Sequence, residues 1–156
     1  MVAEELLPRE GIATRGEVKE YQGVTRSILY AALITHPDVA FAVSRLTRFN
    51  YNPGSKHHRA AERVLDYLQE TINYVLQLGE GEIFEIYSDA SFTDNTLDRK
   101  SSQGMITVLW KGVVAWRACK QTTVTTSTTE AELLALKFTV KEAIYILRLL
   151  KSLREE

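Results

Sequence analysis

The sequence predicts an α/β protein in which a small helical segment precedes antiparallel strands and one long helix. Apolar residues recur at helical spacing between Tyr21 and Leu68. They alternate at strand spacing from Phe84 to Asp89, and two further short apolar runs follow within residues 105–116. A last apolar stripe at helical spacing occupies residues 128–152. These changes of period indicate helices and a sheet, within one domain or two small ones.

The composition is that of an ordinary globular chain, with 45% hydrophobic and 25% charged residues among 156. The net charge of −1 supplies no overall basic field, which argues against tight autonomous binding to nucleic acid. The single cysteine, Cys119, excludes an intramolecular disulfide. The N-terminus lacks the apolar core of a signal peptide, and no run has membrane-spanning length. We therefore expect a soluble intracellular protein of the cytoplasm or nucleus, with no membrane partner.

The N-terminal half is expected to contain a leader and three helices. Residues 1–20 are charged and non-periodic, which predicts a leader or linker. Helical spacing then predicts helices near residues 22–33, 38–49 and 56–69. Pro37 suits the start of the second helix, and the run from Asn52 to Ser55 separates the second from the third. Residues 21–72 are thus predicted to form a helical segment.

Residues 73–156 are expected to form strands followed by a long helix. Strands are predicted at 74–78, 84–89, 105–109 and 113–116, with turns at 79–81 and 111–112. A threonine- and serine-rich stretch at 122–129 leads into a helix near 128–152. Its apolar positions form one stripe, made of Leu133, Leu136, Val140, Ile144, Leu147 and Leu150. This order of elements is typical of the beginning of an α/β domain with a mixed sheet.

Two carboxylates stand out by their positions. Asp89 ends the predicted strand at 84–89, and Glu132 lies in the first turns of the long helix. A strand end and a helix start can direct two carboxylates to one place, where a hard cation such as Mg²⁺ takes oxygen ligands. Such a centre can assist phosphodiester hydrolysis. The alternatives are structural, because a strand-end aspartate often belongs to a turn and helix starts carry capping carboxylates.

The start of the long helix carries two overlapping capping-box patterns. Ser127 is followed three residues later by Glu130, and Thr129 by Glu132. Spacing alone therefore leaves both glutamates open to a capping role.

Several ordered motifs resemble copia-type retrotransposon polyproteins, in the connection segment and the ribonuclease H domain that follows it. The connection-segment motifs lie at residues 21–30, 37–46 and 60–68. The motifs similar to a ribonuclease H domain are Tyr87-Ser88-Asp89-Ala90, Asp98-Arg99-Lys100-Ser101, Trp116…Lys120-Gln121 and Ser127-Thr128-Thr129-Glu130-Ala131-Glu132. The resemblance covers residues 21–150, and it implies a ribonuclease H-like fold for residues 73–156.

The resemblance also implies residue roles. Asp89 matches the family's first catalytic aspartate, and Glu132, which is followed by Leu-x-Ala-Leu, matches its catalytic glutamate. Both would be ligands of Mg²⁺ or Mn²⁺, and the implied substrate is the RNA strand of an RNA–DNA hybrid. Glu130 matches no catalytic position and is interpreted as a capping residue, while Asp94 and Asp98 are interpreted as loop or surface residues.

The family's other catalytic carboxylates follow the long helix, so we expect this sequence to supply only part of the metal site. The family's next strand would also flank the strand at 84–89, whose edge is expected to be open unless residues 74–78 or a second subunit cover it. We therefore expect a homodimer through this edge or the long helix. Two functions stay open: a weak metal-dependent nuclease, and a non-catalytic interaction or assembly module.

Overall fold

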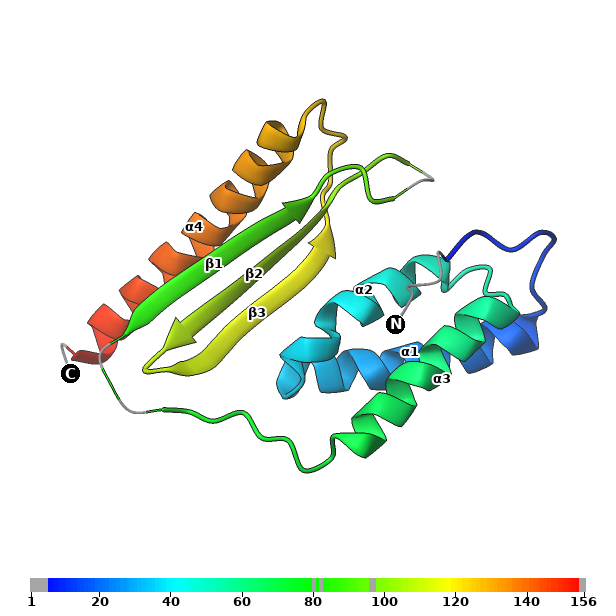
Figure 1. Ribbon diagram of the computed structural model, residues 1–156, viewed down its shortest axis with the longest axis horizontal. Coiled ribbons are helices and arrows are strands. Elements are labelled where there is room, and N and C mark those ends of the chain that lie inside the picture. The colour runs from blue at the N-terminus through cyan, green and yellow to red at the C-terminus, as the bar shows by residue number, and fades with distance from the viewer. Residues whose placement is uncertain (1–5, 80, 82, 96–97, 155–156) are drawn as a thin grey trace. The chain divides into compact units, whose positions relative to one another are not determined.

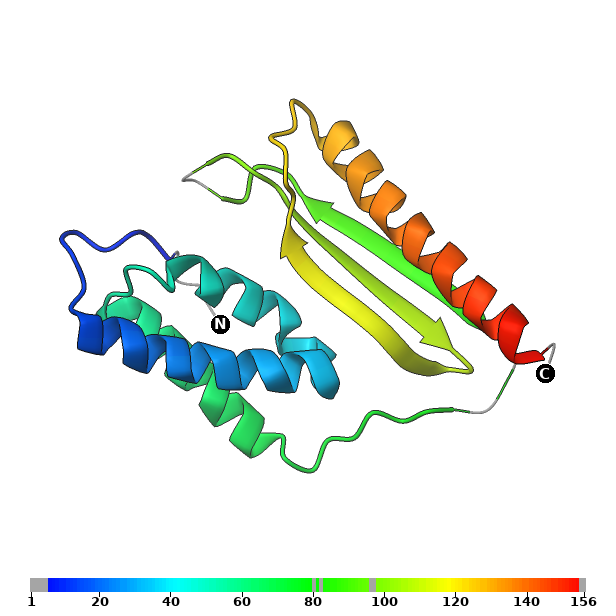
Figure 2. The ribbon, with the colours of Figure 1, turned by 180° about the vertical axis from the view of Figure 1, so that it is seen from behind.

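The chain divides into two compact units. In the computed structural model, residues 6–79, 81, 83–95 and 98–154 are described. The first unit is Met1–Val75 and the second is Leu76–Glu156, a boundary three residues beyond the predicted one. Figures 1 and 2 show the elements of each unit from opposite sides. Among the described residues, none of the helices combines the length and the apolar character needed to cross a membrane.

The first unit consists of helices packed around one apolar core. Its elements are α1 (Arg15–Ile34), η1 (Pro37–Val39), α2 (Ala40–Leu46), η2 (Thr47–Phe49) and α3 (Ser55–Glu70). Tyr21, Ile28, Val43 and Leu46 are fully buried in this core. The Tyr21 hydroxyl donates to the Leu46 carbonyl oxygen at 3.0 Å, so the only polar atom of this buried ring is satisfied. The core ties α1 to α2.

The predicted leader over residues 1–20 is wrong from residue 15 onward, because α1 begins at Arg15. Thr14 caps this helix: its hydroxyl accepts from the Glu17 amide, and Glu17 accepts from the Thr14 amide at 2.7 Å. This capping box starts the helix within a charged segment that shows no apolar periodicity. Residues 1–5 of the predicted leader lie outside the described residues.

The other helices follow the predictions with one change. The helix predicted at 56–69 is confirmed by α3, and the one predicted at 22–33 lies within α1. The one predicted at 38–49 is three short pieces, because α2 has a 3₁₀ turn at each end.

The strand predicted at 74–78 does not form, which corrects that prediction. These residues carry no regular structure, and the Val75 side chain is 85% exposed. Further along, Gly79 lies directly against the turn after Leu109: a Cβ at Gly79 would be only 2.3 Å from the Trp110 carbonyl oxygen. This stretch therefore runs past the end of the sheet and does not pair with it. Glu80, in the predicted turn at 79–81, is outside the described residues.

The second unit has two layers, a three-stranded antiparallel sheet and one long helix (Figure 1). The strands are β1 (Phe84–Ser91), β2 (Ser102–Leu109) and β3 (Gly112–Lys120), in that spatial order, and the helix is α4 (Thr128–Arg154). The mixed α/β class is thus confirmed. Each of these strands contains a predicted strand, and α4 contains the predicted helix.

The turn between β2 and β3 lies one residue earlier than predicted. Leu109 pairs with Gly112, so the two loop residues are Trp110 and Lys111, with φ values of 52° and 64°. Two consecutive positive φ angles define a type I′ hairpin turn, which usually carries asparagine and glycine. Here two residues with large side chains occupy these positions.

α4 packs mainly against β1 and less against β2. Small or polar residues of α4 are buried on the sheet: Ala131, Ala135 and Thr139. The Arg117 guanidinium of β3 lies 5.1 Å from the centre of the Phe138 ring, so the Phe138 side of α4 faces β3. The opposite flank therefore lies over β1 and its outer edge (Figure 2).

The predicted apolar stripe lies on the face of α4 turned away from the sheet, nearly opposite the buried Ala131, Ala135 and Thr139 by helical spacing. Leu133, Leu136, Val140, Ile144 and Leu147 are 44–59% exposed. We refer to these five residues as the outer stripe. β1 is an edge strand, because it pairs only with β2 among the described residues. The open edge that the sequence predicts is thus present, and no described residue pairs with it.

Candidate metal centre

Asp89 and Glu132 lie at the same end of the second unit. Asp89 is near the end of β1, and Glu132 is in the second turn of α4. Because α4 runs back along β1 in the opposite direction, the end of β1 lies beside the start of α4 (Figure 1). The topology therefore brings together the two elements that carry the predicted ligands.

The two carboxylates approach this end from different sides. Burial alternates along β1, with Ser88 and Ala90 half-buried and Asp89 exposed. Asp89 thus lies on the sheet face away from α4. Helical spacing puts Glu132 on the flank of α4 between its sheet-facing side and the outer stripe, which is the flank over the free edge of β1. The two side chains therefore flank that edge from the two sides of the sheet.

Both carboxylates are exposed and unengaged within the described part of the chain. Neither Asp89 nor Glu132 accepts a hydrogen bond or forms an ion pair with a described residue. No group of three or more His, Cys, Asp or Glu side chains that could hold a metal ion occurs among the residues described. The second unit thus offers two free oxygen ligands from two elements. Mg²⁺ accepts such a partial set when substrate phosphates supply other ligands.

Asp98, by contrast, has structural partners. Its carboxylate is 2.6 Å from the Lys120 ammonium and accepts from the Lys100 amide at 3.2 Å and from Asn95. Partial burial opposes ionisation, but Lys120 and these hydrogen bonds outweigh it and lower the pKa of Asp98. Asp94 likewise accepts from the Ser102 hydroxyl at 2.7 Å. Both residues hold the loop after β1 to the strands, as the structural interpretation predicts.

Glu130 has the predicted capping role. Its amide donates to the Ser127 hydroxyl at 3.1 Å, so Ser127 caps α4. Its carboxylate reaches back to the Thr126 amide at 2.6 Å and to the Thr126 hydroxyl at 2.9 Å. The hydrogen bond from the Thr126 amide is the main reason that the pKa of Glu130 is lowered. Glu130 is therefore engaged, whereas Glu132, two residues later, is free in the described structure.

A buried polar cluster, which the sequence analysis did not identify, holds the start of α4 in place. Gln121 is only 3% exposed, and its side-chain amide donates to the Ala131 carbonyl oxygen at 2.8 Å. The Gln121 backbone amide donates to the Ser101 carbonyl oxygen, also at 2.8 Å. The Ser101 and Thr125 hydroxyls are hydrogen-bonded at 3.0 Å. These bonds fix the first turn of α4, and with it Glu132, to the ends of β2 and β3.

The sequence feature that points to this cluster is the position of Gln121, directly after the last residue of β3. A polar residue directly after a strand, seven residues before the start of the helix that must cover that strand, is a candidate for joining the two elements.

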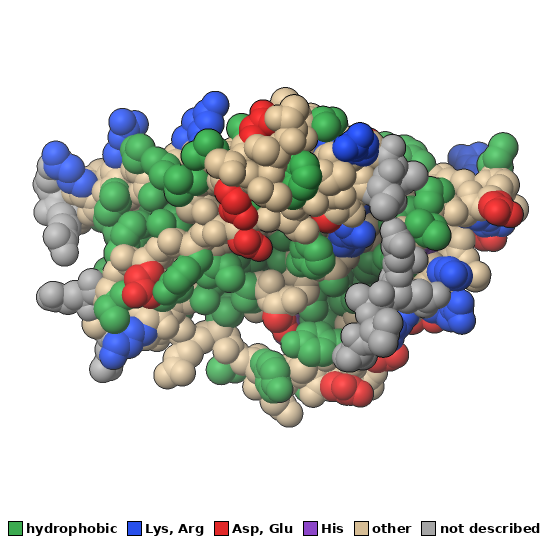
Figure 3. Space-filling model, turned by 45° about the horizontal axis from the view of Figure 1, so that its top comes forward, with side chains coloured by type: hydrophobic (Ala, Val, Ile, Leu, Met, Phe, Trp, Pro, Cys, Tyr) green, Lys and Arg blue, Asp and Glu red, His purple; other side chains and the backbone are tan. Residues whose placement is uncertain are grey.

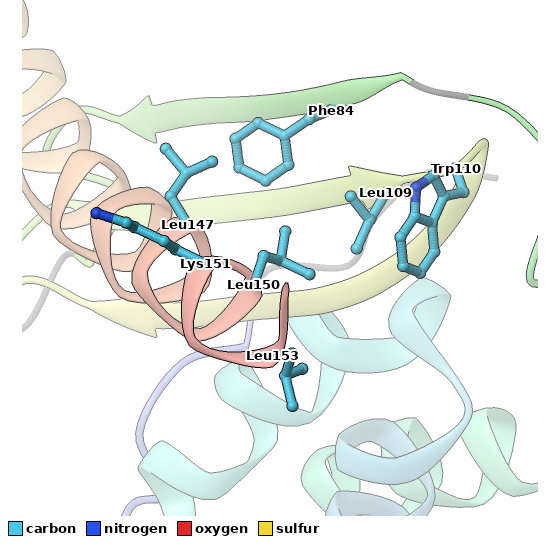
Figure 4. A pocket seen from close by; sticks show the side chains of 7 residues that line it. All are labelled: Phe84, Leu109, Trp110, Leu147, Leu150, Lys151 and Leu153. Carbon is cyan, nitrogen blue, oxygen red and sulfur yellow. The ribbon is translucent and has the colours of Figure 1, made fainter. Parts of the chain in front are cut away.

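An apolar pocket of the second unit lies away from the two carboxylates. It has a volume of about 590 Å³ and lies at the other end, between the start of β1 and the end of α4 (Figure 4). It is lined by Phe84, Leu109, Trp110, Leu147, Leu150, Lys151 and Leu153. One ammonium group among apolar side chains provides no carboxylate for a cation.

Comparisons with known proteins give a consistent result. The chain is 37% identical over 134 residues to a retrovirus-related Pol polyprotein from transposon TNT 1-94 of Nicotiana tabacum, covering 85% of this chain. It is 36% identical over 136 residues to the corresponding polyprotein of transposon RE1 of Arabidopsis thaliana, covering 86% of this chain. The match spans only 10% and 9% of the lengths of these two polyproteins.

A short relative matches almost throughout. The chain is 37% identical over 128 residues to a protein of Plasmopara viticola named secreted RxLR effector protein 161, covering 81% of this chain and 90% of that protein. No protein-family model matches the chain. No solved structure matches it either.

Proposed function

Because the chain belongs to a family of retrotransposon Pol polyprotein segments, we propose that its second unit is a ribonuclease H-like domain of the copia type, acting on the RNA strand of RNA–DNA hybrids. The single observation that carries this proposal is the contrast among the acidic side chains near one end of the unit. Asp94, Asp98 and Glu130 are engaged by neighbours, whereas Asp89 and Glu132 are free within the described chain. The two free residues are those that match the catalytic positions of the family.

Asp89 and Glu132 fit a divalent cation, because they provide oxygen donors from two rigid elements that meet at one end. They would hold Mg²⁺ or Mn²⁺, which would supply water activation and charge stabilisation at the scissile phosphate. In the proposed reaction a water oxygen adds to phosphorus, the bond from phosphorus to the 3′ oxygen breaks, and that oxygen takes up a proton. Gln121 contributes by fixing the first turn of α4, which limits the positions open to Glu132.

Two carboxylates make a weak site. The family's further carboxylates match no residue of this sequence, so the proposed affinity for the cation is low and cleavage by this chain alone is slow. The direct test is therefore binding of the cation, with cleavage as a second readout.

Paramagnetic Mn²⁺ gives this test. Titration of the isotope-labelled chain should broaden the amide signals of the last residues of β1 and the first turn of α4 before any others. Asp89→Asn and Glu132→Gln should each abolish this selective broadening, since each removes a ligand. Asp98→Asn is the matched control, because Asp98 is engaged by Lys120 and should not matter. Broadening that is unchanged in Asp89→Asn would overturn the metal site.

Cleavage of an RNA–DNA hybrid by the chain, if detected with Mg²⁺ or Mn²⁺, should be lost in Asp89→Asn and kept in Asp98→Asn. Cleavage of equal rate in Asp89→Asn would contradict the proposed reaction.

A second candidate function is a non-catalytic interaction or assembly module. The observation that favours it is the combination of the free β1 edge with the exposed outer stripe. Selective Mn²⁺ broadening separates the two candidates, because only the first requires a cation at Asp89 and Glu132.

A further inference from the structure

The motif Asp98-Arg99-Lys100-Ser101 lies in the loop between β1 and β2, and three of its four residues are engaged in holding that loop. The Asp98 carboxylate is 2.6 Å from the Lys120 ammonium. The Ser101 hydroxyl is hydrogen-bonded to a second buried hydroxyl at 3.0 Å, and the backbone of Lys100 takes part in hydrogen bonds within the loop. The Arg99 side chain differs, because it is exposed and makes no hydrogen bond or ion pair with a described residue.

The backbone of Arg99 has a conformation that residues with a side chain disfavour. Its φ is 55°, in the left-handed region where glycine, asparagine and aspartate are common. The Arg99 amide donates to the Asn95 carbonyl oxygen at 2.8 Å, and the Asn95 amide donates to the Lys100 carbonyl oxygen at 3.3 Å. These bonds impose the conformation. The loop therefore requires this backbone shape but not an arginine, and a strained residue held by its surroundings points to a function.

The loop is tied to the sheet face that carries Asp89. Arg117 of β3 contacts α4, so Lys120, three residues later along the strand, lies on the opposite face. Asp89 also lies on the face away from α4. Asp98 is bound to Lys120 on that face. Arg99 follows Asp98 directly, so it lies at the end of the unit where β1 ends and α4 begins (Figure 1).

Arg99 is near enough to Asp89 for one nucleic-acid strand to meet both. Three residues along the chain, at most about 11 Å, separate Arg99 from Ser102. Ser102 pairs with Ser91, which is two residues past Asp89 on β1. These limits put the Cα of Arg99 within about 23 Å of the Cα of Asp89. That span equals roughly seven nucleotides along one strand of a duplex.

In a proposal that rests on the ribonuclease H-like function given above, we propose that the Arg99 guanidinium binds a backbone phosphate of the RNA–DNA hybrid, within about seven nucleotides of the scissile one. A guanidinium is always charged and presents parallel N–H donors that match two phosphate oxygens. Such a contact fixes the position of the hybrid on the loop and carries no sequence information. Arg99 is a binding residue in this arrangement and takes no part in the cleavage step.

The charges around Arg99 favour this role. The neighbouring carboxylate of Asp98 is already paired with Lys120, and Asp94 accepts from the Ser102 hydroxyl at 2.7 Å. On the face that Figure 3 shows, acidic side chains form small separate groups with basic side chains beside them, not one continuous acidic surface. Because the chain has a net charge of −1, a hybrid gains no overall attraction and depends on local cations such as Arg99.

Binding of a short fluorescein-labelled RNA–DNA hybrid to the full chain tests the proposal. Fluorescence anisotropy is measured in EDTA at about 50 mM salt, so that neither a bound cation nor cleavage contributes. The wild-type dissociation constant should be on the order of 10–100 µM. Arg99→Gly should raise it about tenfold, since a charge-assisted contact is lost. The fold is not at risk in this variant, because glycine suits the φ of 55°, and its Tm should rise by several degrees.

Lys111→Gly is the matched control. Lys111 is also a long cation at positive φ, 64°, but it lies in the β2–β3 turn at the other end of the sheet. This variant loses the same charge and gains stability for the same reason, yet its dissociation constant should stay within about twofold of wild type. Equal weakening in both variants would show a general effect of net charge and would overturn the assignment to Arg99, as would unchanged binding in Arg99→Gly.

The salt dependence separates a phosphate contact from a structural role. Arg99→Gly should reduce the slope of log K against log salt by about one, the value for one lost phosphate contact. Arg99→Lys keeps the charge but loses the parallel donors, so it should keep the slope and lose less affinity than Arg99→Gly. An unchanged slope in Arg99→Gly, or no binding of the hybrid by the wild-type chain, would contradict the proposal.

The Mn²⁺ titration keeps this proposal apart from the metal site. Arg99→Gly should leave the selective broadening at the end of β1 and the start of α4 unchanged, because Arg99 is not a ligand. Loss of hybrid binding with intact broadening supports the role of Arg99. Intact hybrid binding in Arg99→Gly refutes that role and leaves the metal site standing, whereas broadening that does not depend on Asp89 refutes the metal site alone.

Discussion

At the scale of single residues, Asp89 and Glu132 differ from the acidic residues near them because their carboxylates have no hydrogen-bond or ion-pair partner among the described residues. The sequence predicts both positions from a strand end and a helix start, and spacing alone does not separate Glu132 from Glu130. The structure shows why Glu130 is a capping residue: Thr126 occupies its carboxylate. Whether the two free carboxylates share a cation stays a prediction. The position of Gln121 directly after a strand makes it a candidate for joining strand and helix, but only the structure identifies its partner, the Ala131 carbonyl oxygen ten residues later.

His57 makes the first unit sensitive to acid. It is buried, stacks on Phe49 at 4.0 Å between ring centres, and accepts the Gly54 amide on Nδ1 at 2.7 Å. Burial lowers the pKa of His57. The unfolded chain therefore binds a proton more readily, and the stability from neutral His57 is full above about pH 6.5 and falls as the pH drops below that value.

Urea unfolding followed by far-ultraviolet circular dichroism should show this loss between about pH 7.5 and 5.5. His57→Gln, which can still accept the Gly54 amide, should lose much less over the same range. An identical pH dependence in the variant would show that another group is responsible.

Gln121 should contribute to the stability of the second unit. Gln121→Leu removes the hydrogen bond to Ala131 at a buried site, and we expect it to lower the free energy of unfolding by about 1–3 kcal/mol. Both tryptophans, Trp110 and Trp116, belong to this unit, so tryptophan fluorescence during urea unfolding measures the change. Gln103→Leu is a matched control, because the half-buried Gln103 side chain makes only a 3.6 Å contact with Cys119 Sγ. Comparable losses in both variants would argue against a specific role for Gln121.

At the scale of elements, the sequence predicts those helices and strands whose side-chain pattern matches the face they bury. It fails for segments whose structure depends on pairing with another part of the chain. The alternation at 84–89 and the long stripe at 128–152 correspond to β1 and α4, because each pattern matches a face that the fold presents. Residues 74–78 form a short, mostly apolar run that predicts a strand, but they pair with no strand among the described residues and stay irregular. Apolar spacing alone predicts the start of α1 too late, because the pattern Thr14-x-x-Glu17, a capping box, marks the true start. The apolar spacing of the outer stripe is visible in the sequence. The sequence does not show that these residues lie outside the contact between α4 and the sheet.

The β2–β3 turn offers a stabilising substitution. Lys111 has a φ of 64°, a conformation that costs residues with a side chain about 1–2 kcal/mol relative to glycine. Lys111→Gly should therefore raise the free energy of unfolding of the second unit by about 1 kcal/mol, which is a rise of roughly 4–8 °C in Tm for a domain of this size. Lys111→Ala should give no comparable gain, because alanine keeps the steric conflict. Thermal unfolding followed by tryptophan fluorescence decides between these outcomes.

At the scale of the whole molecule, the chain carries two compact units whose sequence is that of a retrotransposon Pol polyprotein segment. The chain matches only about a tenth of the length of the large polyproteins. The activities of those polyproteins are therefore proposals for this chain.

The central claim is that Asp89 and Glu132 form one cation site, and Mn²⁺ titration of the isotope-labelled chain tests it most directly. The account predicts that amides at the end of β1 and the start of α4 broaden first, and that adding Asp89→Asn or Glu132→Gln removes this effect while Asp98→Asn preserves it. Broadening spread evenly over the acidic surface, or unchanged by Asp89→Asn, would contradict the claim.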